Sequence, residues 1–139
     1  MPGIARKKLA SYRNVQKSTT TPAQRVVMCY DAIIRDLNQA DAAFDDTTPD
    51  RFAVIHNALS HATQIIMELK GALDPAVAPE LCDTLSGLYA FWIEHLSEAN
   101  AKKDRGRIGQ VREMLKELRD TWHEANRKAA SGQGTSSGI

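Results

Sequence analysis

Residues 85–122 read LSGLYAFWIEHLSEANAKKDRGRIGQVREMLKELRDTW, and this stretch decides the fold. On both sides of Asn100–Asp104, apolar residues recur at spacings of three and four, which is the period of an amphipathic helix. The predicted core positions of these two helices are Leu85, Leu88, Trp92, Leu96 and Ala99, followed by Ile108, Val111, Leu115, Leu118 and Trp122. The stretch therefore predicts two helices joined by a short turn.

Two more amphipathic helices precede this pair. Thr21 followed by Pro22 is typical of a helix start, and the spacing of Val27, Tyr30, Ile34 and Leu37 predicts a helix over residues 22–44. Turn-forming residues occupy positions 45–50. The next helix is predicted from the apolar series Phe52, Ile55, Leu59, Ala62, Ile66, Leu69 and Leu73. Four helices of about 20 residues with short connections predict an all-α antiparallel four-helix bundle, with axes about 20° from parallel.

The bundle is expected to occupy residues 21–129 of a chain of 139 residues, a length that fits one domain. Residues 1–20 are predicted to form an amino-terminal arm, with a possible short helix around residues 5–16. Residues 130–139 are rich in Ser and Gly, and we expect a disordered tail there.

The composition excludes several classes of partner. Eighteen Lys and Arg residues nearly balance 17 Asp and Glu residues, so bulk charge does not favour nucleic acid or an anionic membrane surface. No run approaches the roughly 18 apolar residues of a membrane span, and no targeting signal or membrane insertion is expected. Cys29 and Cys82 are predicted to be reduced, buried thiols. These features favour a cytoplasmic protein that does not bind nucleic acid.

The apolar faces of the helices are wider than one packing seam requires. On the third helix they cover about half of the circumference, and second apolar lines flank the seams of the first two helices. Helices that contact two neighbours also need wide faces, so burial inside the bundle is the alternative interpretation. The residues predicted to contact a partner on these flanks are Ile33, Val54, Ile65, Tyr89, Phe91 and Ile93.

The arm offers a cover for part of this surface. Ile4, Leu9, Tyr12 and Val15 supply apolar groups among basic and polar residues, and a short helix of this kind is marginal alone. We expect the arm to dock reversibly over an apolar groove, with Tyr12 in contact, until a partner displaces it.

Several short motifs recur in an order that resembles one protein family. They are Thr21-Pro22, Met28, Tyr30-Asp31, Ile34, Leu88-Tyr89, Ala99-Asn100, Asp104 and Leu118-Arg119-Asp120-Thr121-Trp122. The set is similar to the flagellar secretion chaperones called FliS, over roughly residues 12–124. The chain departs from the family where leucines often precede the tyrosine of the first helix, since Val26, Val27 and Cys29 stand there.

The resemblance implies a cytoplasmic four-helix-bundle chaperone of bacterial flagellum biogenesis. Such a protein binds the disordered carboxy-terminal segment of flagellin, prevents premature polymerisation, and aids delivery to the export gate of the flagellar type III secretion system. The resemblance implies no catalysis, no cofactor and no metal. We expect a monomer or a weak homodimer.

Other family positions are expected to shape the groove. Arg119 can pair with Asp31 or Asp104, Asn100 is predicted to cap the third helix at its carboxyl end, and Asp104 to cap the start of the fourth. Tyr30 lies on the seam of the first helix, and Trp92 and Trp122 are predicted to be core residues.

Other classes of function fit less well. A di-iron bundle needs inward carboxylates and paired Glu-x-x-His motifs, whereas the inward positions here are apolar, and His56 and His61 lie five residues apart. His95 is predicted to be partly buried with a hydrogen-bond partner. A histidine phosphotransfer bundle using His61 is an alternative, although no basic and small residues follow this histidine closely. A structural homodimerising bundle is another alternative.

Overall fold

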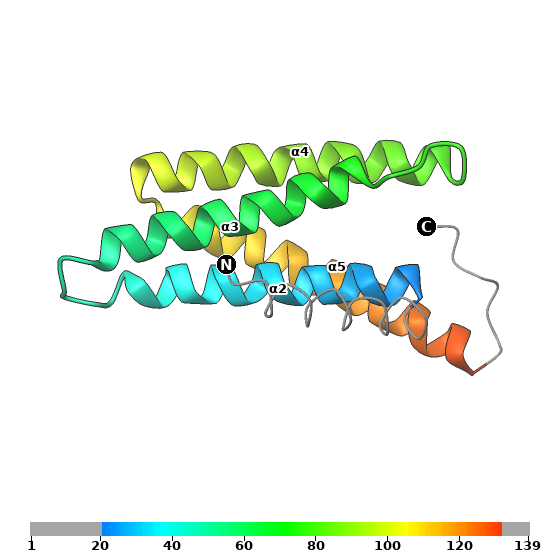
Figure 1. Ribbon diagram of the computed structural model, residues 1–139, viewed down its shortest axis with the longest axis horizontal. Helices are drawn as coiled ribbons and strands as arrows, with labels where there is room; N and C mark the ends of the chain where they lie inside the picture. The colour runs from blue at the N-terminus through cyan, green and yellow to red at the C-terminus, as the bar shows by residue number, and fades with distance from the viewer. Residues whose placement is uncertain (1–20, 132–139) are drawn as a thin grey trace, which may run out of the picture.

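The computed structural model describes residues 21–131, which form four α-helices and no strand. The helices are α2 (Pro22–Ala43), α3 (Arg51–Gly71), α4 (Pro79–Lys102) and α5 (Arg105–Ala130). Figure 1 shows them lying lengthwise beside one another, connected by short turns. Helices α2 and α4 each pack against both α3 and α5, so α2 and α4 face each other across the centre. This arrangement confirms the predicted all-α four-helix bundle. The predicted arm, including Tyr12, and most of the predicted tail lie outside the described residues.

Side chains at the helix ends satisfy backbone groups that the helices leave free. The Thr21 hydroxyl accepts a hydrogen bond from the Gln24 amide at 3.1 Å, and the Gln24 side chain accepts one from the Thr21 amide at 2.9 Å. This capping box fixes the start of α2, with Pro22 in its first turn. The Asp104 carboxylate accepts from the Gly106 amide at 3.1 Å, which confirms the predicted cap of α5.

The predicted carboxyl-end cap at Asn100 is wrong. Helix α4 continues to Lys102, and Lys103 adopts the left-handed conformation with φ 51° that ends it. The Lys103 ammonium donates to the Asn100 carbonyl at 2.8 Å and to its side-chain oxygen at 2.5 Å. Asn100 therefore contributes hydrogen bonds from inside the last turn, and these bonds hold a residue type that rarely adopts this backbone conformation.

Three aromatic side chains fill the centre of the bundle. The Tyr30 and Tyr89 hydroxyls share a hydrogen bond of 2.6 Å across the diagonal between α2 and α4, and Trp92 packs edge-on against Tyr30. All three are fully buried. Burial raises the pKa of both tyrosines, because the charged phenolate would lose its hydration. The hydrogen bond lets the two polar groups occupy the core in neutral form.

The apolar seams follow the predicted spacing, with three corrections. Ile33 is buried and Ile34 is half-buried, whereas the prediction placed Ile34 on the seam. Tyr89 is buried and Leu88 only half-buried, and Phe52 is 48% exposed although it was predicted to begin the seam of α3. Each helix packs against two neighbours, so the buried face is centred between them, and this centre cannot be read from one helix alone.

A ladder of polar pairs joins α2 to α5. Arginines on α5 recur every seven residues, as do their partners on α2 and in the turn that follows it, and in an antiparallel pair such rows meet along one line. The ladder pairs are Asp31 with Arg119 at 2.9 Å, Asn38 with Arg112 at 3.4 Å, and Asp45 with Arg105 at 2.8 Å. Asp41 lies between the Asn38–Arg112 and Asp45–Arg105 pairs and contacts both arginines. The structure thus places Arg119 on Asp31, one of its two predicted partners.

The helix ends and turns gather at two opposite ends of the bundle (Figure 1), and the residues at these ends differ chemically. The charged end contains the α2–α3 and α4–α5 turns, where the Arg105 guanidinium contacts Asp41 and Asp45 and keeps the pKa of both carboxyls below the ordinary value. The open end contains the start of α2, the α3–α4 turn and the end of α5. Among residues 21–131, no helix combines the length and hydrophobicity needed to cross a membrane.

Candidate functional site

Apolar side chains are exposed mainly at the open end. Met28, Met67, Val77 and Leu81 all lie there, and between 41% and 56% of each residue is accessible. They come from α2, the end of α3, the following turn and the start of α4. Exposed apolar groups gathered from several elements are typical of a binding surface.

The first hollow at this end lies between α2 and α3. It is mostly apolar, and its lining residues are Pro22, Arg25, Val26, Cys29, Glu68, Leu69 and Ala72. Cys29 is half-buried, and desolvation raises the pKa of its thiol. A thiol of this kind behaves as a small apolar group, so the hollow is suited to aliphatic side chains.

Two further hollows lie between α3 and α4. The outer one is lined by Met67, Lys70, Gly71, Ala90, Ile93 and Glu94. The other lies at the α3–α4 turn and is lined by Lys70, Leu73, Pro75, Pro79, Cys82, Asp83 and Ser86. Lys70 borders both, so the two hollows adjoin along the last turns of α3.

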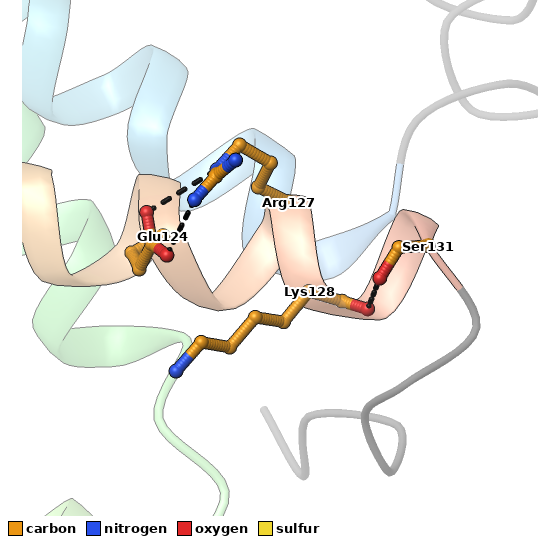
Figure 2. Close-up of a pocket in the computed structure, with 4 residues that line it drawn as sticks. All are labelled: Glu124, Arg127, Lys128 and Ser131. Carbon is orange, nitrogen blue, oxygen red and sulfur yellow. Dashed lines mark hydrogen bonds and ion pairs between the residues drawn. The ribbon is translucent and has the colours of Figure 1, made fainter.

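The side of the bundle formed by α2 and α5 has hollows of different character. One is lined by Gln24, Val27, Met28, His123, Asn126, Arg127 and Ala130, and it is largely apolar. Figure 2 shows a polar one beside the end of α5, where Arg127 binds Glu124 at 2.8 Å and the Ser131 hydroxyl donates to the Lys128 carbonyl at 2.8 Å. Because charged and polar side chains line it, this hollow fits an apolar partner poorly.

The structure exposes some of the residues predicted to contact a partner and buries others. Ile93 lines the hollow between α3 and α4, and Phe91 is 45% exposed. Val54 and Ile65 are half-buried against the core. Ile33 and Tyr89 are fully buried, so the expectation that they present surface to a partner is wrong. Both belong to the buried face of their helix, and the Tyr89 hydroxyl is hydrogen-bonded to the Tyr30 hydroxyl in the core.

Three of the four histidines connect neighbouring helices. His95 confirms the expected partly buried position, since its Nδ1 accepts from Arg107 at 3.2 Å and its Nε2 donates to Gln110 at 2.5 Å. His61 lies 2.6 Å from Asp36 of α2, and the Asn100 amide donates to His56 at 2.9 Å. In the part of the chain from Thr21 to Ser131, no group of His, Cys, Asp and Glu is arranged to hold a metal ion.

Sequence reasoning missed Met67, Val77 and Leu81 as surface residues. Val77 lies in a turn, where helical spacing gives no information. Met67 and Leu81 fall near apolar runs that the spacing assigns to a broad face, and their exposure depends on where the neighbouring helix ends. The signal available in the sequence was their position next to Gly71 and Pro79, where the hairpin turns.

Comparison with known proteins assigns the chain to a family. Residues 5–129 match the family described as flagellar protein FliS. The chain belongs to the FliS family. FliS from Bacillus subtilis, a flagellar secretion chaperone, is 27% identical over 127 residues, which cover 89% of this chain and 92% of the relative. The Campylobacter jejuni FliS is 28% identical, with 88% and 94% covered, and the Escherichia coli FliS is 28% identical, with 73% and 74% covered.

Family membership agrees with the architecture. The FliS match spans all four helices, including the Arg119–Asp31 pair and the buried Tyr30 and Trp122. Asp31 and Arg119 join α2 to α5, Asp104 caps the start of α5, and neither contact lines the apolar hollows at the open end.

Proposed function

We propose that this chain is a flagellar export chaperone that holds the disordered carboxy-terminal segment of flagellin against the apolar hollows of its open end. The observation that carries the proposal is the concentration of exposed apolar side chains and mainly apolar hollows at one end of a bundle of the FliS family. The relatives are named flagellar secretion chaperones, which supports the same role.

The physical basis is coupled folding and binding. A disordered segment with apolar residues at helical spacing cannot bury them by itself, and a grooved bundle gives those residues a surface to fold against. Ordering the segment costs part of the interaction free energy, so the complex can be protective and still release its client. No cofactor, metal or chemical step is needed, and we propose a non-enzymatic protein.

Binding would prevent premature polymerisation by covering the segment, and would keep the client suited for delivery to the flagellar export gate. We place this activity in the cytoplasm. We propose that Phe91 and Ile93 contact the client, with Val54 and Ile65 in a second line of contacts. Tyr12 is the proposed contact residue of the arm.

The arm supplies a testable element of this mechanism. Residues 1–20 connect directly to α2 at the rim of the hollow between α2 and α3. We propose that the arm covers apolar surface in the free chaperone and that the client displaces it. Deletion of residues 1–19 would then raise client affinity without unfolding the bundle, and loss of folding on deletion would show that the arm belongs to the core.

The deciding experiment is calorimetry of the full chain with a synthetic peptide of the flagellin carboxy-terminal segment. We expect saturable binding with a negative heat-capacity change, because apolar surface becomes buried. Size-exclusion chromatography of the free chain and of the mixture gives the stoichiometry. A stable homodimer without affinity for the peptide would overturn the proposed function in favour of a structural bundle.

A further inference from the structure

The two halves of α4 are held in the bundle by different interactions. From Tyr89 onward, polar contacts reach every other helix: Tyr89 bonds Tyr30 of α2, His95 bonds Gln110 of α5, and Asn100 bonds His56 of α3. Across the described range 21–131, no side-chain hydrogen bond or ion pair connects residues 79–88 to another helix. This first half of α4 is held by the packing of Cys82, Leu85 and Leu88.

The neighbouring features also favour motion of this half. Helix α4 packs less extensively against its neighbours than the other helices do, and its contact with α5 is the least extensive in the bundle. Gly87 lies at the boundary between the two halves, and glycine weakens a helix at that point. The preceding turn exposes Val77, and the first turn of α4 exposes Leu81.

Long stretches of α3 and α4 contain no charged residue. From Phe52 to Met67, α3 contains no Asp, Glu, Lys or Arg, and α4 contains none from Thr84 to Ile93. Charged residues nevertheless line both hollows between these helices. Lys70 borders both, Glu94 lines the mostly apolar hollow around Met67 and Ile93, and Asp83 lines the more polar hollow at the α3–α4 turn. The hollow around Met67 and Ile93 is therefore the part of this surface that suits an apolar segment.

We infer that residues 79–88 swing outward as a flap hinged at Gly87, and that an apolar helical turn of the client occupies the space between the flap and the last turns of α3. This inference rests on the proposed function for the identity of the client. The contacts of Tyr89, His95 and Asn100 hold the second half of α4 in place, so the bundle stays folded while the flap opens. Met67 of α3 contacts the inserted segment, which extends past the hinge into the adjoining hollow, where Ile93 of the fixed half contacts it.

Hydrogen exchange of the free full-length chain tests the flap without any client. We expect residues 80–88 to exchange faster than residues 89–102, because local opening exposes the first set alone. Uniform protection along α4 would overturn the flap.

The chain supplies a matched pair of glycines for the second test. A Cβ atom at Gly87 would meet nothing within 4 Å, and one at Gly109 in α5 would meet only the Arg112 side chain at 3.9 Å, so both positions accept alanine. Gly87→Ala should slow exchange of residues 80–88 by about two- to fivefold through its helix propensity, whereas Gly109→Ala should leave that segment unchanged. Association of the flagellin peptide, followed by stopped-flow fluorescence, should slow in Gly87→Ala alone. Equal association rates in the two variants would overturn the flap as the entry route.

Two exposed methionines test where the client segment binds. Met67 and Met28 are both exposed, on opposite sides of the open end. Met67→Gln should weaken peptide binding about tenfold by removing one apolar contact, and Met28→Gln should weaken it less. Equal effects would overturn this location, as would a homodimer that Met67→Gln dissociates. Failure of the peptide to bind the unmodified chain would overturn the proposed function and the proposed binding of the client under the flap. Hydrogen exchange of the free chain would still show whether residues 79–88 open.

Discussion

At the residue scale, the Tyr30–Tyr89 hydrogen bond links two helices that are not neighbours. Tyr89→Phe should destabilise the protein by about 1–3 kcal/mol, because the buried Tyr30 hydroxyl loses its hydrogen bond with Tyr89. The double variant Tyr30→Phe with Tyr89→Phe should recover most of that loss. Urea unfolding of the single and double variants measures the coupling, and strictly additive losses would contradict it.

Burial separates residues that maintain the fold from residues available to a client. Leu115 is fully buried, and Leu115→Ala should cost about 2–5 kcal/mol of stability. Phe91 stacks on His95 and is 45% exposed, so Phe91→Asp should weaken binding of the flagellin peptide with a modest loss of stability. Ile65→Asp should act similarly. Thermal unfolding and calorimetry of the three variants make the comparison. Equal unfolding in all three would place Phe91 and Ile65 in the core.

At the element scale, the ladder sets the register between α2 and α5. Its pairs recur at intervals of seven residues, so a slip by one turn would separate every arginine from its partner. Each pair is partly exposed and contributes little by itself, since exposed pairs are worth about 0–1 kcal/mol. The ladder therefore contributes more to specificity of alignment than to total stability.

The ladder also gives stability a dependence on acid. The hydrogen bond from Arg105 is the main cause that lowers the pKa of Asp41 in the folded state. A lowered pKa stabilises the fold above the unfolded value of about 4 and loses that effect as pH falls through the folded value. Asp41→Asn should therefore lower stability at pH 7 by no more than about 1 kcal/mol and make its decline below pH 4 shallower.

Chemical unfolding between pH 2 and pH 7 measures this difference. Glu113→Gln is the matched control, because this carboxylate lies on α5 outside the ladder, 3.9 Å from Lys116. An acid profile of Asp41→Asn that matches the unmodified chain would contradict the assigned role of Asp41.

Helical spacing predicted the existence and type of all four helices, because the apolar period is a local property of each segment. It was less successful at predicting which residues of each helix are buried and which are exposed. Ile33 and Tyr89 were predicted as flank residues and are buried, while Phe52 was predicted as core and is exposed. A shift of one residue turns a side chain by about 100°, and only the positions of two neighbouring helices select the buried direction.

At the scale of the whole molecule, the two ends should differ in function. Leu81 at the open end and Phe52 near the charged end have similar exposure, 41% and 48%, and Phe52 is covered on one side by the Arg51 guanidinium. Leu81→Ser should weaken binding of the flagellin peptide, whereas Phe52→Ser should weaken it less. Calorimetry of both variants tests this difference, and a larger effect at Phe52 would place the client at the wrong end.

The sequence by itself determined the helices, their order, the caps at Thr21 and Asp104, and the motifs that resemble the FliS family, because these depend on residues close together along the chain. The tertiary structure alone decided which apolar flanks remain exposed, the pairing of Arg119 with Asp31, and the separation of a charged end from an open end. These features depend on how far each helix extends past its neighbours and on which two helices it contacts. Local periodicity specifies a helix face, but burial is a property of the assembled bundle.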